Sequence, residues 1–262
     1  MVNILITTAH PDDELIWFGS TLYELAKIKD INIFNICFWG ILEKPGSMRS
    51  VTPGYKDIDR KSQFYEISNF MNFKSHIITD TKHKVEQKSR QKDEVIKEEL
   101  FNGLKILNLE LKNIDLIITH SYYGDERRHP HHIRIYDFFS KFSLENNIGF
   151  SFISILRIPN VSHKSILKET KRLNQIHLLS LEKIENESLN IVNKPSYLIE
   201  FQGNLDKKLE ALKLYKAVNF KKHYNDYYAF SVISEKLYTN QSGFKIMNNI
   251  LNKFNIIVKN IF

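Results

Sequence analysis

Two segments of the chain are unusually rich in residues that can bind a metal or move a proton. The first, TTAHPDDELIWFGS, spans residues 7 to 20, and the second, THSYYGDERRHPHHIRIYDFF, begins at Thr119. Their histidines and acids are His10, Asp12, Asp13 and Glu14 in the first segment and His120, Asp125, His129, His131 and His132 in the second. Imidazole and carboxylate groups are the usual protein ligands of catalytic zinc. The sequence therefore predicts a metal site if the fold brings the two segments together.

The spacing within each segment supports this prediction. His10 and Asp13 are three residues apart, as are His129 and His132, so each pair lies on one face where a helix begins. Two imidazoles and one carboxylate, with positions left for water, suit a catalytic zinc. A further carboxylate can deprotonate the bound water, whose pKa the metal lowers to about 7. Asp12 is placed for that role.

A structural explanation exists for the acidic residues of the first segment. Asp12, Asp13 and Glu14 are all residues that favour the first turn of a helix, where they cap it and complement its dipole. That explanation would suffice for these three residues alone. The joint occurrence of two such segments, each after a predicted strand, favours a functional site.

The elements that must position these residues alternate along the chain. Apolar runs that read as strands cover residues 2–9, 31–39, 75–79 and 114–120, and helical patterns cover 14–29, 60–72 and 90–109. This order predicts an α/β fold, a Rossmann-like open, mostly parallel sheet flanked by helices. Ligands of such sheets bind beyond the carboxyl ends of the strands. Both polar segments follow strands, so we expect the active site at that edge.

The remaining sequence carries weaker signals. IGFSFISILRI and SYLIEF read as further strands, residues 205–218 as a helix, and residues 40–59 as a long loop that could cover the site. No linker divides the chain, so we expect a single domain over residues 1–262, less well defined from about residue 145. In residues 243–262 the apolar side chains form one helical stripe with a basic polar face. We expect this C-terminal helix to pack on the domain or a second subunit; the alternative is a peripheral membrane contact.

Composition excludes several classes of protein. The 262 residues are 42% apolar with a net charge of +7, and the excess lysine and arginine are spread along the chain. A nucleic-acid-binding protein would need them clustered, so we expect no nucleic-acid partner. Cys37 is the sole cysteine, so no internal disulfide forms, and the N-terminus reads as neither signal peptide nor spanning helix. We expect a cytoplasmic protein.

The chain resembles the PIG-L/LmbE-like de-N-acetylases. AHPDDE after the first strand and GDERRHPHH after a later one are similar to the two signature segments of that family. RKSQFYEISNFMNF (60–73) resembles the family's arginine-led helix, and KKLEALKLYKAV (207–218) resembles its C-terminal helix. The resemblance implies a zinc-dependent hydrolase that uses a metal-activated water to remove the N-acetyl group of an N-acetylglucosamine-type sugar conjugate.

The resemblance also implies roles for individual residues. His10, Asp13 and His132 would hold one zinc ion per chain, and Asp12 would be the general base. His129 would support the tetrahedral intermediate and aid proton delivery. The residues expected to bind the small-molecule sugar conjugate are Arg60, Asp125 and His131.

The sequence departs from the family pattern at several positions. His131 stands where the family has an aspartate that holds the first histidine of its motif, and Gln63 stands where glutamate is common. Ala217 and Val218 replace a common Ser-Gln pair. We expect these changes to alter substrate or pH optimum and to leave metal binding intact.

Two other readings of the sequence stay open. One is a metal-binding relative of the same fold with altered catalysis, for which His131 is the best argument. The other is a non-haem iron oxygenase, because His10-x-Asp12 with a distant histidine matches the facial-triad pattern, although such enzymes normally use an all-β barrel. The sugar conjugate and the oligomeric state are not encoded in any motif.

Overall fold

The computed structural model of the protein describes residues 1–39, 55, 57–78, 91–121, 129–153, 195–201, 204–217, 235–251 and 257–260. Residues 40–54, most of the loop predicted to cover the site, lie outside this set. Asp125 also lies outside the described residues.

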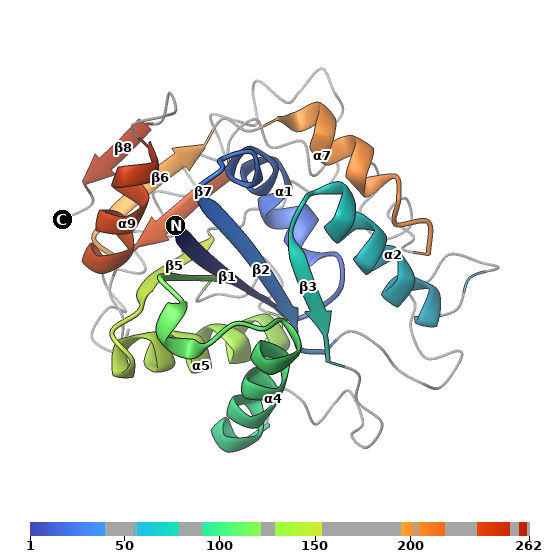
Figure 1. Cartoon of the computed structure of the whole chain (residues 1–262), viewed down its shortest axis with the longest axis horizontal. Helices are drawn as coiled ribbons and strands as arrows, with labels where there is room; N and C mark the ends of the chain where they lie inside the picture. Colours follow the sequence, from blue (N-terminus) through green and yellow to red (C-terminus); the bar gives the residue numbers. More distant parts are fainter. Residues whose placement is uncertain are drawn as a thin grey trace.

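An open eight-stranded sheet forms the centre of the molecule, in the order β3-β2-β1-β4-β5-β7-β6-β8 (Figure 1). Its strands are β1 (Val2–Thr8), β2 (Ile31–Cys37), β3 (Lys74–Ile77), β4 (Leu116–Thr119), β5 (Gly149–Ile153), β6 (Tyr197–Phe201), β7 (Glu235–Thr239) and β8 (Ile257–Asn260). The first five are parallel, and the last three are antiparallel to their neighbours. The predicted α/β fold with a mostly parallel sheet is confirmed.

Strand β1 lies at the point where the sheet reverses its order. From β1 the chain runs outward through β2 and β3, then returns to place β4 on the other side of β1. Because β1 is covered on both faces, its sequence VNILITT has apolar residues in succession on both faces, with Ile4 and Ile6 in one core and Leu5 in the other. The carboxyl ends of β1 and β4 therefore meet at a topological switch point, the usual place for a ligand in such sheets.

Helices cover both faces of the sheet. They are α1 (Asp13–Ala26), α2 (Asp57–Phe70), α4 (Asp93–Ile106), α5 (Pro130–Glu145), α7 (Leu205–Leu212) and α9 (Gln241–Leu251), with a 3₁₀ turn at Leu111–Asn113. Side chains from α1, α2, α7 and α9 contribute to one core, and side chains from α4 and α5 contribute to the other. Figure 1 shows α4 and α5 on the opposite side of the sheet from α1, α2 and α7.

Three helices end in the same way, with an asparagine two residues past the helix. Asn72, Asn108 and Asn147 follow α2, α4 and α5, each with a positive φ between 52° and 58°. Asparagine tolerates this left-handed conformation, which ends a helix and lets the next amide bond back to it. The next residue is in each case a buried apolar side chain: Phe73, Leu109 or Ile148. These turns direct the chain into β3, the 3₁₀ turn before β4, and β5.

The C-terminal segment differs from its prediction. Helix α9 ends at Leu251, and residues 257–260 form β8, which pairs with β6, so a single helix over 243–262 is wrong. The apolar stripe of α9 does pack inward, since Met247 and Ile250 are buried in the core. Strand β7 was missed because its sequence EKLYT begins with two charged residues and has only two apolar or aromatic positions, Leu237 and Tyr238.

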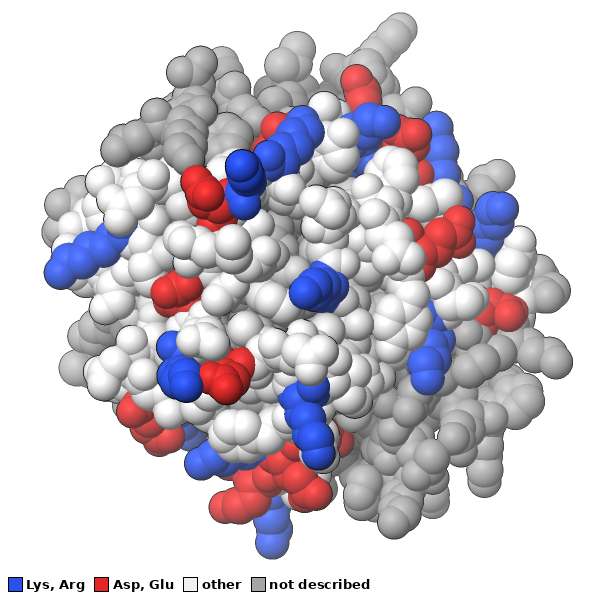
Figure 2. All heavy atoms as spheres, viewed as in Figure 1, with Lys and Arg blue, Asp and Glu red and all other residues white. Residues whose placement is uncertain are grey.

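The described surface is mixed in charge. On the face shown in Figure 2, lysine and arginine side chains are interspersed with aspartate and glutamate, and the described part of that face shows no large patch of one charge. None of the described helices combines the length and the apolar character that crossing a bilayer requires. The cytoplasmic location and the membrane contact through the C-terminal segment stay predictions.

Candidate metal centre

The turn between β1 and α1 folds around the side chain of Asp13. Asp13 is the first residue of α1, and its Oδ2 accepts a hydrogen bond from the backbone N–H of His10 at 2.7 Å. Asp12 occupies the N-cap position, but its side chain makes no capping hydrogen bond to the described helix. A capping hydrogen bond therefore does not account for Asp12, whereas Asp13 and Glu14 do lie in the first turn of the helix.

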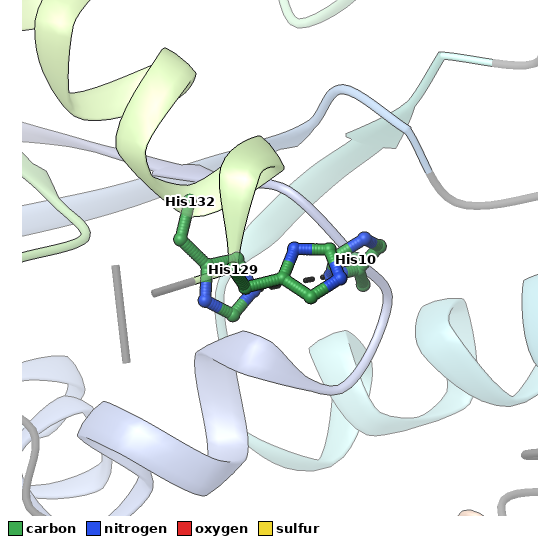
Figure 3. A group of neighbouring side chains, drawn as sticks. All are labelled: His10, His129 and His132. Carbon is green, nitrogen blue, oxygen red and sulfur yellow. Dashed lines mark hydrogen bonds between the residues drawn. The ribbon is translucent and has the colours of Figure 1, made fainter. Parts of the chain in front are cut away.

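The second segment enters the site where α5 begins. Pro130 is the first residue of α5, where its fixed φ and missing N–H suit the start of a helix. This start places His131 and His132 in the first turn, where both are buried, and His129 at the N-cap. Figure 3 shows His129 and His132 at the start of α5 next to His10 of the β1–α1 loop. The predicted meeting of the two segments is observed.

Three donor atoms form a nearly equilateral triangle. His10 Nδ1 lies 3.2 Å from His132 Nε2, and Asp13 Oδ2 lies 3.3 Å from each of these nitrogens. Zinc–nitrogen and zinc–oxygen bonds of about 2.0–2.1 Å with tetrahedral angles require ligand atoms about 3.3–3.4 Å apart. The three atoms are therefore spaced as the ligands of one tetrahedral zinc ion would be.

The protonation states suit a metal. Burial lowers the pKa of His10 well below its ordinary value, although Asp13 acts in the opposite direction. The imidazole is therefore neutral at neutral pH and can offer a lone pair. Burial by itself would raise the pKa of Asp13, but the neighbouring His132, His120 and His10 together outweigh it and hold that pKa well below its usual range. Asp13 is therefore a carboxylate, so both groups are in the form that binds metal.

His120, which follows β4, contacts two members of this triangle, Asp13 and His132. It is fully buried, and its Nε2 accepts the backbone N–H of Ala9 at 2.9 Å while lying 3.3 Å from Asp13 Oδ2. His10, His129 and His132 could hold a metal together, and so could Asp13, His120 and His132. Because the Ala9 amide occupies the lone pair of His120 Nε2, the second set is the poorer one. Instead, the ring of His120 stacks on that of His132, with centroids 4.1 Å apart.

Asp12 lies beside the triangle without belonging to it. The Nη2 of Arg60, from α2, is 3.5 Å from Asp12 Oδ2, and both side chains are more than nine-tenths buried. Arg60 thus reaches the site from the neighbouring helix, as its position in the arginine-led segment predicted. In the described structure its guanidinium faces Asp12.

The other two histidines of α5 surround His10. The ring of His129 is edge-on to that of His10, with centroids 4.9 Å apart. His131 Nδ1 lies 3.0 Å from the second ring nitrogen of His10, Nε2. With Asp125 outside the described residues, seven of the eight predicted site residues lie in this cluster or in contact with it.

Positions that depart from the family pattern contact one another behind the site. Gln63 Oε1, from α2, accepts the backbone N–H of Ala217 at 2.9 Å, and both residues are buried. The nearby Tyr215 hydroxyl donates to Glu14 Oε1 at 2.5 Å. The segment after α7 is therefore fastened to α1 and α2.

Sequence reasoning gave no role to His120, Trp17 or Tyr215. The indole N–H of Trp17 donates to Asp13 Oδ1 at 3.3 Å, which orients the carboxylate. Trp17 is one helical turn from Asp13, a spacing that predicts such a contact. His120 follows β4 directly, so its place at the sheet edge was a usable signal. Tyr215 lies 201 residues from Glu14, and no local pattern connects them.

Comparison with known proteins adds a family. Residues 5–143, just over half of the chain, match the PIG-L family model, described as GlcNAc-PI de-N-acetylase. No curated protein matches the chain. Teicoplanin deacetylase Orf2, in a zinc-inhibited form, superposes with a TM-score of 0.56 at 10% identity, covering 91% of this chain and 97% of that one. A40926 pseudoaglycone deacetylase Dbv21 superposes with a TM-score of 0.54 at 10% identity, covering 90% and 96%. At such identities the two structures show a shared fold.

Proposed function

The chain belongs to the PIG-L family of de-N-acetylases, and we propose that it is a zinc-dependent hydrolase acting on an N-acetylglucosamine-type sugar conjugate. The reaction is the removal of the N-acetyl group by an activated water. The observation that carries this proposal is the triangle of His10 Nδ1, Asp13 Oδ2 and His132 Nε2, with sides of 3.2–3.3 Å, at the switch point of the sheet.

His10, Asp13 and His132 would hold one zinc ion, and the remaining coordination position would face water and substrate. When bound, the metal lowers the pKa of a water molecule and polarises the amide carbonyl. Two neutral imidazoles and one carboxylate leave one positive charge on the occupied site, which favours the negative charge that develops as water attacks the amide. Carboxylate and imidazole ligands are typical of catalytic zinc sites.

Asp12 would act as the general base. It is adjacent in sequence to the ligand Asp13 and outside the triangle, so its carboxylate is available to take a proton from the attacking water. Arg60 restricts the orientation of this carboxylate from the other side. A positioned base of this kind accelerates a reaction by about 100- to 10,000-fold.

His129 would donate a hydrogen bond to the oxyanion and help deliver a proton to the leaving amine. It stands at the start of α5, and the centroid of its ring lies 4.9 Å from that of His10 and 4.8 Å from that of His132. Arg60, Asp125 and His131 would contact the sugar conjugate.

The alternatives differ in how well the structure suits them. An iron oxygenase of the facial-triad type normally uses an all-β barrel, and the described fold is an α/β sheet. A metal-binding relative with altered catalysis would share the fold and the triangle. Turnover alone separates this second alternative from the enzyme.

Release of free amine and acetate from a panel of N-acetylated compounds tests the proposal. The panel contains N-acetylglucosamine, N,N'-diacetylchitobiose and a nucleotide-linked N-acetylglucosamine. Teicoplanin is included because proteins of this fold are named as deacetylases of that antibiotic. We expect release from at least one compound, its loss with a chelator and its recovery with added zinc. Stoichiometric zinc binding with no release from any compound would favour the altered relative.

A further inference from the structure

His10 uses its two ring nitrogens in two different directions. Its Nδ1 faces Asp13 and His132, the other two members of the triangle. Its Nε2 faces away from the triangle and lies 3.0 Å from Nδ1 of His131. His131 is only 5% exposed, so water does not replace this contact easily.

Metal binding would fix the direction of the hydrogen bond between these two histidines. A neutral imidazole carries one proton, and a nitrogen that binds a metal must offer its lone pair. If His10 Nδ1 holds the metal, the proton is on Nε2, which then donates to His131 Nδ1. His131 must in turn keep its own proton on Nε2. Metal-binding histidines almost always donate their second N–H to an acceptor of this kind, more often a carboxylate or a carbonyl.

The ring of His131 packs against a tryptophan that is itself held by hydrogen bonds. The indole of Trp39, after β2, packs against it with ring centroids 5.1 Å apart. Trp39 Nε1 donates to Gln91 Oε1 at 2.8 Å, and the backbone carbonyl of Gln91 accepts two hydrogen bonds from Arg134 of α5. The Trp39 indole therefore restricts the orientations that the His131 ring can adopt.

We propose that His131 is a positioning residue of the metal site, whose Nδ1 accepts the Nε2–H of His10 and so fixes the ring that binds the metal. The inference rests on the proposed metal site. It gives His131 a role in addition to the proposed contact with the sugar conjugate. This role also differs from holding His129, whose ring meets that of His131 only edge-on, with centroids 4.9 Å apart. An imidazole acceptor also carries no negative charge, so His10 is a less basic ligand here than it would be beside a carboxylate.

Three substitutions separate the acceptor from the volume of the side chain. His131→Asn keeps an acceptor oxygen close to the position of Nδ1, whereas His131→Gln carries its amide one bond farther out, near the position of Nε2. His131→Leu has no acceptor. The measured quantity is the zinc dissociation constant of the metal-stripped protein, by competition with a chromophoric chelator, after circular dichroism has shown that each variant is folded.

We expect His131→Leu to bind zinc about 10- to 100-fold more weakly than the wild type, as is typical when the partner of a metal-binding histidine is lost. His131→Asn should stay close to the wild type, and His131→Gln should resemble His131→Leu. The visible spectrum of the cobalt-loaded protein should change in the same order, because it reports the geometry of the ligands.

Wild-type affinity in His131→Leu would overturn the inference while leaving the proposed function intact. If His131→Leu fails to fold, equal affinities of the Asn and Gln variants would overturn it. A loss in His131→Leu that His131→Asn shares would mean that the ring acts by packing, which also contradicts the acceptor role. A wild-type protein that binds no zinc would overturn the proposed function and, with it, this inference.

Discussion

Two groups of buried charged residues lie against α1, and they differ in how their charges are satisfied. Near the middle of the helix, Lys208 of α7 donates to Glu235 of β7 at 2.8 Å, and the backbone N–H groups of Ser20 and Thr21 donate to the same carboxylate at 3.2 and 2.7 Å. At the start of the helix, the second group brings together His10 Nδ1, Asp13 Oδ2 and His132 Nε2, which lie 3.2–3.3 Å from one another.

The difference supports our proposal that the second group is the functional one. The Lys208–Glu235 group is complete, because the positive charge and the backbone donors satisfy both carboxylate oxygens. Buried charges are costly unless they are paired in this way. In the triangle the described groups that contact Asp13 Oδ2 are a backbone N–H and histidine rings, whose charge depends on their protonation, and none of these is a cation of fixed charge. Under the proposed function a divalent cation would supply that charge, so we expect the first group to affect folding and the second to affect metal binding.

Breaking the complete group should have the largest effect on stability. Lys208→Met keeps most of the apolar stem but leaves Glu235 buried without its cation. We expect the free energy of unfolding to fall by about 3–5 kcal/mol, the usual cost of removing one partner of a buried pair. Urea denaturation of the metal-free protein measures it.

The neighbouring lysine provides the control for this variant. Lys207 pairs with Glu210 on the exposed side of the same helix, so Lys207→Met should leave the midpoint of unfolding almost unchanged. Similar midpoints for the two lysine variants would show that the Lys208–Glu235 pair does not stabilise the fold.

Within the site, Asp12→Asn should separate catalysis from metal binding. The variant keeps the triangle and loses the base, so we expect zinc content near that of the wild type and a maximal rate lower by about a hundredfold or more. Steady-state kinetics on the substrate found in the panel measure the rate. The exposed Asp206→Asn is the matched control and should keep full activity. Unchanged turnover of Asp12→Asn would remove Asp12 from the mechanism.

Glu14 is a third buried acidic residue of α1, and it follows Asp13 directly in the sequence. Burial raises the pKa of Glu14 well above its ordinary value, and Tyr215 donates to one of its oxygens. Tyr215→Phe leaves that buried oxygen without its donor, so the free energy of unfolding should fall by about 1–3 kcal/mol. Zinc content should stay unchanged, because neither residue belongs to the triangle.

Tyr65→Phe is the matched control for Tyr215→Phe. The Tyr65 hydroxyl is half-buried and accepts a longer hydrogen bond, at 3.3 Å, from the backbone of Ile77. We expect the free energy of unfolding to fall less in Tyr65→Phe than in Tyr215→Phe. If Tyr215→Phe lost its zinc, Glu14 and Tyr215 would have to be counted with the site.

The sequence allowed the parallel half of the sheet to be predicted because most of its strands are buried on both faces. Largely apolar runs such as VNILITT predict such strands, and the helices between them carry a clear period. The antiparallel end was harder. Strand β7 is short with a charged first residue, and β8 continues an apolar stripe that α9 begins, so the helical pattern appeared to extend to the end of the chain.

The candidate site was predictable for a related reason. Residues that follow parallel strands must meet at the carboxyl edge, so His10 and His132 could be placed together from the order of elements alone. The partner of His131 could not be predicted, because it depends on where α5 begins and which way one ring turns. The Gln63–Ala217 and Glu14–Tyr215 contacts join residues more than 150 positions apart, for which the sequence offers no local signal.

Elemental analysis of the purified protein tests the central claim most directly. The wild type, loaded with zinc and dialysed, should hold about one zinc ion per chain, as a single triangle of ligands requires. His132→Ala removes one corner of the triangle and should hold almost none, whereas Lys207→Met should hold as much as the wild type. Full occupancy in His132→Ala would contradict the assignment of His10, Asp13 and His132 as the metal ligands.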